Sequence, residues 1–474
     1  MLVVALVLSA CTGGVDRAGS TGADAPDALA FADGDGGEVD AASGVVWRLA
    51  LVAPASRQPS DVVLTDQSSV IVTDLLFDGL TAVGPDGSLV PALATGWEAS
   101  GDFATWTFTL DPARVTAAEV VAHIDVMRAR TDSEAVAPLL DGLVSVVAAS
   151  DHEVRFGFDS PRAGFPWLAS GVGLSVPRAG GEPSSGFVVV DDAASALVLE
   201  RDPAVAVPGV GRIEVHWADD SARAYEMLTL GLVDVAPVPV AEMADAMDRF
   251  GFRPGHPLAT TAFVALNPAA ATWADLVLVD AVHLSLDHVA LAAAAGLAPV
   301  DGVVSPALAG YAVDACGAQC GDDPEFARLL VTDPAVGAVP PTLVFGSTQA
   351  PGADPLERTV AEALDAAGFV IEHRQLTADE LTAGIDAGVV DLHVAVSSPA
   401  ASTLDAVTLF SAGASGSIGA DGLRWAELQN THRQVLEQGH LVPVGARTST
   451  LVVAPSIADL VVRADGSVAY EAAQ

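Results

Sequence analysis

The hydrophobic positions along the chain follow two alternating periods from residue 45 onward. Residues 45–51 form an apolar run typical of a buried strand, and residues 106–110 alternate apolar with polar positions, as a half-buried strand does. Between them, residues 69–79 carry an apolar stripe at helical spacing and end on a glycine, a common helix stop. Strands that alternate with helices in this way predict an α/β fold with mixed sheets.

The same alternation continues through the rest of the chain. In chain order, the pattern predicts a strand at 213–217, a helix at 221–231, a strand at 233–238, a strand at 343–345, a helix at 355–368 and a strand at 369–373. Thr116 followed by Glu119 forms a capping box, which predicts a helix that begins at Ala117. Residues 276–300 predict one helix of a globular domain and not a membrane span, because aspartates and histidines interrupt the apolar run.

The first eleven residues have the features of an export signal. Residues 1–10 are mostly apolar, and Leu8, Ser9 and Ala10 precede Cys11 in the order of a bacterial lipobox, in which the cysteine thiol accepts a diacylglyceryl group. A chance cysteine in a trimmed secretory signal is the alternative. Residues 12–43 are dominated by Gly, Ala, Asp and Ser, which bury too little apolar surface to offset the entropy of ordering. They predict a flexible acidic tether.

Composition narrows the classes of partner. A chain of 474 residues is expected to form two or three domains. It carries 61 acidic and 21 basic residues and no lysine, for a formal net charge of −40, so nucleic acid is excluded as a partner because phosphates are repelled. The missing lysines also remove Schiff-base chemistry and the lysine of a phosphate loop. A salt-loving host and a G+C-rich coding bias remain equally open as the origin of this composition.

Few residues are arranged for catalysis or metal binding. Cys316 and Cys320 lie in a loop-like context, and a local disulfide is the favoured interpretation for an exported protein, with metal binding as the alternative. No metal and no cofactor are predicted, because the histidines are scattered. The segment 413–416 contains a serine between glycines, but its spacing does not match a nucleophile elbow. These observations predict that the protein is not an enzyme.

A series of short motifs from residue 77 onward is more specific. The motifs are Phe77-Asp78-Gly79-Leu80, Pro85-Asp86-Gly87, Leu89-Val90-Pro91-Ala92-Leu93-Ala94, Trp97-Glu98, Thr107-Phe108-Thr109-Leu110, Leu199-Glu200-Arg201-Asp202-Pro203, Gly231-Leu232-Val233-Asp234-Val235-Ala236, Phe263-Val264-Ala265-Leu266-Asn267 and Leu441-Val442-Pro443-Val444. In order and spacing, the chain resembles family 5 of the bacterial extracellular solute-binding proteins over about residues 44–474. This family includes the oligopeptide-, dipeptide- and nickel-binding lipoproteins of ABC importers.

The resemblance implies a two-lobed periplasmic-binding-protein-like α/β fold with mixed sheets, a hinge and an extra subdomain in the N-terminal lobe. The expected division of the chain is a signal and lipobox at 1–11, the tether at 12–43, an N-terminal lobe at 44–265 with an inserted subdomain at about 72–178, a C-terminal lobe at 266–447 and a return segment to the N-terminal lobe at 448–474. A ligand is expected between the two lobes, where contacts to both of them stabilise the closed form.

The function implied by the resemblance is that of an extracytoplasmic, monomeric lipoprotein at the outer face of the cytoplasmic membrane. It is expected to bind a small peptide-like solute and deliver it to the permease and ATPase subunits of an ABC importer. The alternatives are a non-transporting sensor, a degenerate paralogue of the same fold, or a binder of a glycoside or a nickel complex.

The candidate ligand-binding residues follow from the expected strand ends in the two lobes. In the first lobe they are Val52, Ala53, Pro54 and Ala55, and in the second lobe they are Ser397 and Ser398. Peptide binders of the family carry an acidic residue at the second-lobe motif, which pairs with the ligand's amino group, whereas this sequence has the two serines. A buried ammonium without a close carboxylate is costly, so free dipeptides are expected to bind poorly. A rearranged loop that brings Asp405 back to the site is the alternative.

Two further segments depart from the family pattern. The stretch that precedes the capped helix is shortened here to Asp111-Pro112-Ala113-Arg114-Val115, and a glycine-rich turn survives only as Ser184-Ser185-Gly186-Phe187. These departures weaken the assignment of the ligand while leaving the fold expectation intact.

Overall fold

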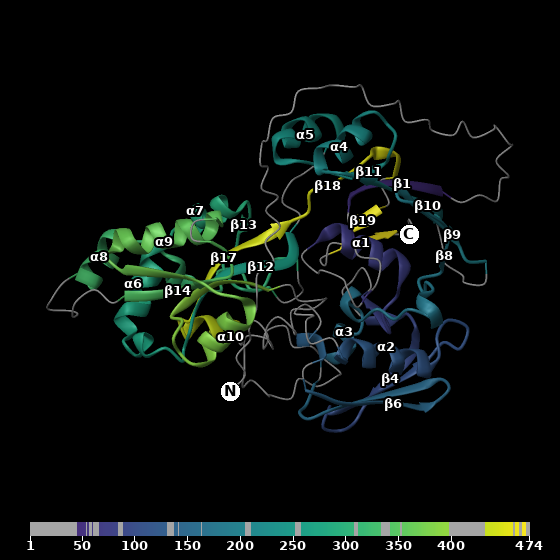
Figure 1. Cartoon of the computed structure of the whole chain (residues 1–474), viewed down its shortest axis with the longest axis horizontal. Helices are drawn as coiled ribbons and strands as arrows, with labels where there is room; N and C mark the ends of the chain where they lie inside the picture. Colours follow the sequence, from purple (N-terminus) through teal and green to yellow (C-terminus); the bar gives the residue numbers. More distant parts are fainter. Residues whose placement is uncertain are drawn as a thin grey trace.

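The computed structural model shows two six-stranded sheets and a smaller inserted sheet (Figure 1). It describes residues 45–53, 55, 59, 66–83, 89–129, 137–140, 142–162, 164–203, 210–251, 257–307, 311–332, 342–350, 353–397, 432–457, 460–463 and 467–470. Cys11 and the tether at 12–43 lie outside the described residues. The arrangement confirms the predicted α/β class with mixed sheets.

The first lobe is built on a mixed sheet that contains the first strand of the fold. In spatial order its strands are β18 (Leu451–Val453), β11 (Val235–Pro237), β1 (Val45–Val52), β10 (Val210–Ala218), β9 (Ala196–Arg201) and β8 (Phe187–Asp192). One face packs on α1 (Gln67–Leu76) and on the hairpin of β19 (Leu460–Val462) and β20 (Val468–Tyr470). Small residues of the other face, among them Ala50 and Ala218, pack on α4 (Ser221–Thr229) and on Ala246 of α5 (Met243–Phe250).

The second lobe is a mixed sheet with helices packed on it. In spatial order its strands are β13 (Ala298–Pro299), β17 (Leu441–Thr448), β12 (Pro257–Leu266), β16 (Leu392–Ser397), β14 (Thr342–Ser347) and β15 (Val370–Gln375). The helices of this lobe include α6 (Leu276–Ser285), α7 (His288–Ala295), α8 (Pro324–Thr332), α9 (Pro355–Ala367) and α10 (Ala378–Asp386), and residues 432–437 are also helical. Residues of α6, α7, α8 and α9 share one core with Val264 and Phe345 of the sheet.

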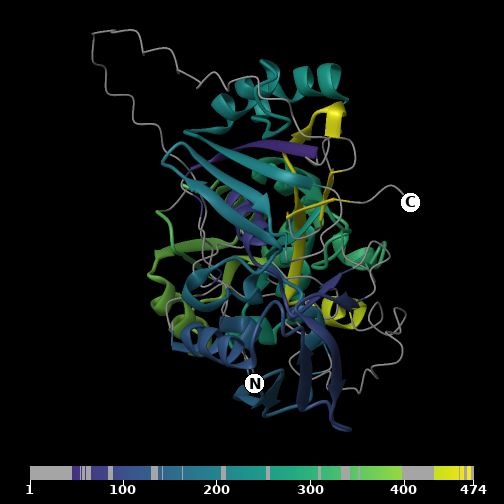
Figure 2. The same ribbon diagram turned by 90° about the vertical axis from the view of Figure 1, so that its right-hand side faces the viewer.

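The inserted subdomain is a four-stranded antiparallel sheet. Its strands, in spatial order, are β4 (Ala94–Ala99), β5 (Thr105–Leu110), β7 (Glu153–Phe158) and β6 (Leu143–Ser150). It packs on α2 (Ala117–Ala129) and α3 (Phe165–Leu168), and a short hairpin of β2 (Thr81–Val83) and β3 (Leu89–Pro91) precedes it. Figure 2 shows this subdomain at one end of the first lobe, with α4 and α5 at the other end.

Short connecting turns complete the described elements. These 3₁₀ helices are Ala137–Leu140, Val172–Leu174, Ala179–Gly181, Val240–Glu242, Ala271–Ala274, Gly317–Cys320 and Pro455–Ile457.

Local sequence signals explain several of these boundaries. The capping box at Thr116 forms as expected: the Thr116 N–H donates to the Glu119 carboxylate at 2.7 Å, and the Glu119 N–H donates to the Thr116 hydroxyl at 3.3 Å. In β5, the alternation places Trp106, Phe108 and Leu110 in the core. Helix α1 begins two residues earlier than predicted and ends at Leu76 rather than Gly79. The missed signal is Asp66, whose carboxylate accepts the N–H groups of Ser68 and Ser69.

The single helix expected over residues 276–300 is wrong. The structure breaks it into α6 and α7, which meet at an angle of 60°. The cause is Asp287, whose carboxylate accepts the N–H groups of Val289 and Ala290 at 2.9 and 3.0 Å and so starts a new helix. Among the described residues, no single helix is long and apolar enough to cross a membrane, although α6 and α7 together pass by length and composition alone.

Two of the expected domain boundaries shift in the structure. The expected boundary between 265 and 266 cuts through β12, because all of this strand pairs in the second sheet, so the chain changes lobe before residue 257. The expected start of the insertion at 72 lies inside α1, whose Val72 and Leu75 pack in the first-lobe core. The core of the inserted subdomain instead spans Leu80 to Val176.

Candidate functional site

The first lobe gathers the carboxyl ends of its parallel strands at one edge. Strand β1 pairs in parallel with both β10 and β11, so Val52, Ala218 and Pro237 end on the same side of the sheet. The candidate residue Ala53 continues from this edge, and its N–H donates to the Ala218 carbonyl at 2.9 Å. Ala55 packs against the core of the same lobe. Pro54 lies outside the described residues.

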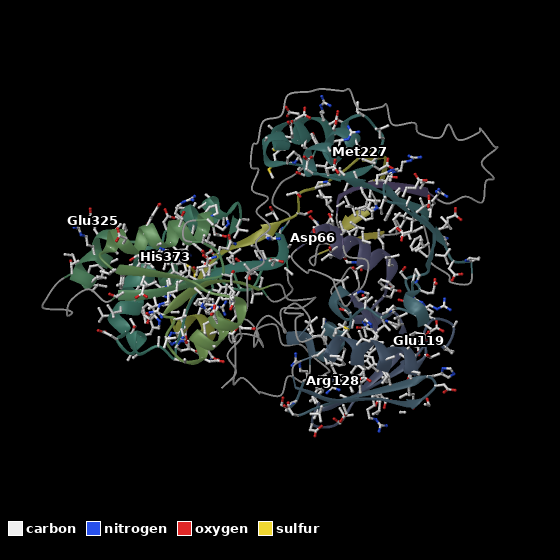
Figure 3. All side chains as sticks on the ribbon, viewed as in Figure 1. Asp66, Glu119, Arg128, Met227, Glu325 and His373 are labelled. Atoms are coloured by element: carbon white, nitrogen blue, oxygen red, sulfur yellow. A yellow bond between two sulfur atoms is a disulfide. The ribbon has the colours of Figure 1, made fainter. Side chains whose placement is uncertain are left out.

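Helix α1 returns to this edge with its N-terminus. The Val52 N–H donates to the Ser68 hydroxyl at 3.3 Å, which joins the end of β1 to the first turn of the helix. Asp66 caps that turn, and Figure 3 labels it at the start of α1. The first turn of α1 therefore belongs to the same edge as the candidate residues after β1.

The second lobe has the same organisation. Strands β14 and β16 are parallel to each other. Strand β12 runs antiparallel to β16, and β17 runs antiparallel to β12, so β17 points in the same direction as β16. The carboxyl ends of β14 and β16 therefore lie at the edge where β12 begins and β17 ends. Ser397 is paired with Thr261, and Thr261 is also paired with Ala446. The candidate Ser398 and the residues up to 431 lie outside the described residues.

Residues 303–305, which we call the covering segment, lie against this end of β12. The Thr261 hydroxyl donates to the Val303 carbonyl at 2.6 Å, and the Ser305 hydroxyl donates to the Leu258 carbonyl at 2.5 Å. The Val303 N–H in turn donates to Nε2 of His432 at 3.2 Å. Because His432 is almost fully buried, burial lowers the pKa of this imidazole to about 4 and keeps it a neutral acceptor. The Thr261 hydroxyl is therefore used to hold the covering segment.

Two chain connections join the lobes at these edges. One runs from β11 to β12 and the other from β17 to β18, and we call them the interlobe crossings (Figure 1). The Val238 N–H of the first crossing donates to the Thr450 carbonyl of the second at 2.8 Å. The Gln67 amide of α1 donates to the Ser449 hydroxyl at 3.2 Å. The carboxyl edges of both sheets therefore lie at the same two interlobe crossings. Open α/β sheets bind their ligands at the carboxyl ends of their strands.

One buried acid near the second-lobe edge was missed by the sequence analysis. Glu357, in the first turn of α9, is 5% exposed and accepts a hydrogen bond from the Ser347 hydroxyl at the end of β14, at 2.7 Å. Burial raises the pKa of Glu357 to about 7, and the Ser347 hydrogen bond opposes that rise. The spacing from Asp354, which caps α9, is that of a capping box, yet the glutamate side chain bonds to the strand instead.

Two cysteines and two histidines of the second lobe have structural roles. Cys316 and Cys320 form a disulfide with their Cα atoms 5.6 Å apart, and Cys316 packs in a small core with Phe263. The rings of His283 and His288 hydrogen-bond to the backbone carbonyls of Gly439 and Pro443. Within the part of the chain that the structure describes, no group of three or more His, Cys, Asp or Glu side chains is placed to hold a metal ion.

The comparisons with solved structures agree on the fold. The structure is similar to HbpA2 from Haemophilus parasuis (TM-score 0.70, 15% identity, 90% of this chain and 100% of that chain). It is also similar to the unliganded open form of the periplasmic murein tripeptide binding protein MppA (TM-score 0.68, 16% identity, 90% of this chain and 95% of that chain). A third similar structure is that of NikA from Brucella suis in complex with Fe(III)-EDTA (TM-score 0.63, 16% identity, 90% of this chain and 100% of that chain).

At sequence identities of 15–16%, the similarity to these solved structures shows the fold alone. The search of curated proteins found no match to the sequence. The profile of the bacterial extracellular solute-binding proteins, family 5, middle region, matches residues 88–419, which is more than half of the chain. The two lobes, the mixed sheets and the inserted subdomain agree with that match. The chain therefore belongs to family 5 of the bacterial extracellular solute-binding proteins.

Proposed function

We propose that this chain is the extracytoplasmic binding component of an ABC importer, which captures a peptide-like solute between its lobes and delivers it to the permease. The observation that carries the proposal is the meeting of both carboxyl edges at the interlobe crossings. A solute that contacts both edges stabilises the closed form over the open form, since only the closed form offers both sets of contacts. Closure then marks the loaded protein for the permease.

The proposed contact residues are those at the two edges. Val52, Ala53, Pro54 and Ala55 are assigned to the first lobe, and Ser397 and Ser398 to the second. Solved relatives differ in their ligands, which include a murein tripeptide for one and Fe(III)-EDTA for another, so the fold does not select the solute. The serines favour a solute without a free ammonium group at this point, such as a blocked or longer peptide. A glycoside, a nickel complex and a sensor role remain as outcomes of the test.

Closure on a peptide-like solute is tested by calorimetric titration combined with small-angle scattering. The panel consists of free dipeptides, the same dipeptides N-acetylated, and tri- to hexapeptides. We expect at least one blocked or longer peptide to bind and to lower the radius of gyration at saturation. Free dipeptides are expected to bind at least about tenfold more weakly, a difference of about 1.4 kcal/mol.

A matched pair of variants makes this test sharper. Ser397→Asp or Ser398→Asp introduces the missing carboxylate, and the one that faces the solute is expected to strengthen the binding of free dipeptides about tenfold or more. The wild type serves as the reference on the same panel. An unchanged radius of gyration with a saturating solute contradicts closure, and micromolar binding of several free dipeptides by the wild type contradicts the assignment of the serines.

The proposed location depends on the segment before the fold. Cys11 is assigned as the lipidated residue, residues 12–43 as the tether, and the monomeric protein as held at the outer face of the cytoplasmic membrane. One acyl chain alone anchors weakly, whereas two or more anchor stably. Cys11→Ser in the native host is expected to move nearly all of the protein from the membrane fraction to the soluble fraction. If the variant stays in the membrane fraction at the wild-type level, the anchor proposal is wrong.

A further inference from the structure

The covering segment is bound, at its start, to a loop that a disulfide closes. We call residues 311–320 the disulfide loop. The Cys316 N–H donates to the Asp301 carbonyl at 2.9 Å, and the Asp314 N–H donates to the Asp301 carboxylate at 3.2 Å. Cys316 is bonded to Cys320 at the end of the loop. Because Asp301 lies two residues before the covering segment, the disulfide loop and that segment are held together.

The disulfide loop packs on the face of the second sheet that leads to the candidate edge. Cys316 shares a small core with Phe263 of β12 and Ala395 of β16. Phe263 is paired with Ala395, and nearer the edge Thr261 is paired with Ser397. Because side chains alternate along a strand, the second pair lies on the same face as the first. The loop therefore packs on the face that carries the candidate residue Ser397.

The covering segment joins two parts of this edge. Its Val303 carbonyl accepts a hydrogen bond from the Thr261 hydroxyl of β12, and its Val303 N–H donates to the ring of His432, where the helix at 432–437 begins. This ring packs closely on the neighbouring backbone, because a Cβ atom added at Gly302 would lie 2.4 Å from Cε1 of His432. Val303 is 1% exposed, so its bonds are shielded from water. Any displacement of the covering segment therefore breaks bonds to both parts.

The two sulfur atoms of the disulfide differ in their access to a reductant. Cys316 is 6% exposed, whereas Cys320 is partly exposed. In thiol–disulfide exchange, a thiolate attacks one sulfur and displaces the other. A dithiol is therefore expected to attack Sγ of Cys320, so that Cys316 leaves as a thiolate and takes up a proton. The second thiol of the reductant then displaces Cys320, which leaves two thiols on the protein and a disulfide on the reductant.

We infer that this disulfide is a redox latch for the second-lobe edge. With the bond formed, the disulfide loop holds Asp301 and, through it, the covering segment against β12. With both thiols free, the loop gains conformational freedom, since a cross-link restricts the chain that it closes. The covering segment is then held less firmly, and a looser edge costs more to order when a solute binds. Only this last step rests on the proposed function.

The latch is tested first without a solute, by hydrogen exchange of the oxidised and the reduced protein. The full chain carries Cys11→Ser, which leaves Cys316 and Cys320 as its only cysteines. Reduction with dithiothreitol is expected to raise amide exchange at residues 258–261 and 301–305 about tenfold or more, equivalent to about 1.4 kcal/mol. Removal of the reductant and reoxidation are expected to restore the slow exchange. Strands β1 and β10 of the first lobe are expected to exchange alike in both states.

Two variants separate loss of the bond from other effects. Cys316→Ala combined with Cys320→Ser is expected to exchange like the reduced protein and not to respond to dithiothreitol. Val313→Ala, at a position of the same loop that is 73% exposed, keeps the bond and is the matched control, expected to exchange like the oxidised protein. A response of the cysteine-free variant to the reductant overturns the latch. A rise in exchange that is confined to the disulfide loop, or one that persists after reoxidation, overturns it as well.

The effect on the solute is measured by calorimetric titration of both redox states with a peptide of the panel that binds the oxidised protein. Reduction is expected to weaken the binding of this peptide about fivefold or more. Equal affinities in the two states overturn the latch as a control on solute binding. If no peptide of the panel binds either state, the proposed function fails, and the exchange result alone decides the latch.

Discussion

Phe108→Ala is expected to lower the free energy of unfolding of the inserted subdomain by about 3–5 kcal/mol. Phe108 is fully buried in β5, with ring centroids 5.7 Å from Phe156 and 5.9 Å from Phe165 in edge-on geometry. The substitution removes the transfer free energy of the ring, leaves a cavity and ends both aromatic contacts. Chemical denaturation followed by fluorescence and circular dichroism measures the loss.

The control for this prediction is Phe326→Ala. Phe326 lies in α8 and is 49% exposed, so the same loss of a ring is expected to cost less than about 1 kcal/mol. A loss below about 1 kcal/mol for Phe108→Ala contradicts the assignment of this side chain to the centre of the subdomain core.

Glu357→Gln is expected to stabilise the protein at alkaline pH and to leave it nearly unchanged at about pH 4, below the pKa of the unfolded chain. The pKa of Glu357 rises from 4.5 to about 7 on folding, so the folded state holds this proton more tightly than the unfolded chain. The resulting stabilisation is fully present below pH 4.5 and is lost as the pH rises through 7, when a charged carboxylate has to remain buried. Glutamine keeps an acceptor for Ser347 and carries no charge.

The size of this effect follows from the shift. The pKa of Glu357 rises from 4.5 to about 7, so at about 1.4 kcal/mol per pKa unit the upper limit is about 3.5 kcal/mol. Partial access of water lowers this limit, so about 1–3 kcal/mol is expected at pH 8.5. Denaturation midpoints of both proteins at about pH 4 and at about pH 8.5 measure the difference. Glu362→Gln on the exposed side of the same helix is the control and is expected to show no such difference. Equal stability of Glu357→Gln and wild type at pH 8.5 contradicts the prediction.

Local sequence patterns were sufficient wherever near neighbours decide the structure. The capping box of Thr116 and Glu119 fixes the start of α2, and the period-two pattern fixes which side chains of β5 are buried. Both features depend on interactions between residues that are close in the sequence, so they can be predicted without knowledge of the rest of the fold. The order of motifs added the family, which the comparisons confirm.

Two of the errors were local, and one concerned strand pairing. An aspartate cap was missed twice, at Asp66 before α1 and at Asp287 between α6 and α7. The spacing of apolar residues does not reveal such a cap, because a single polar residue interrupts the pattern too little to be noticed. The boundary at 265 was placed by motif order, which carries no information on which strands pair.

The sequence by itself determined the class of fold, several strands and helices, the family and the acidic, lysine-free character of the chain. The tertiary structure alone decided which polar groups come together. Ser347 with Glu357, and Arg114 with Asp78 and Ser184, are brought together by strand order and chain connections and not by their spacing in the sequence. The physical reason is that burial and pairing of a polar group depend on neighbours that lie far away in the chain, and these are fixed only when the sheets assemble.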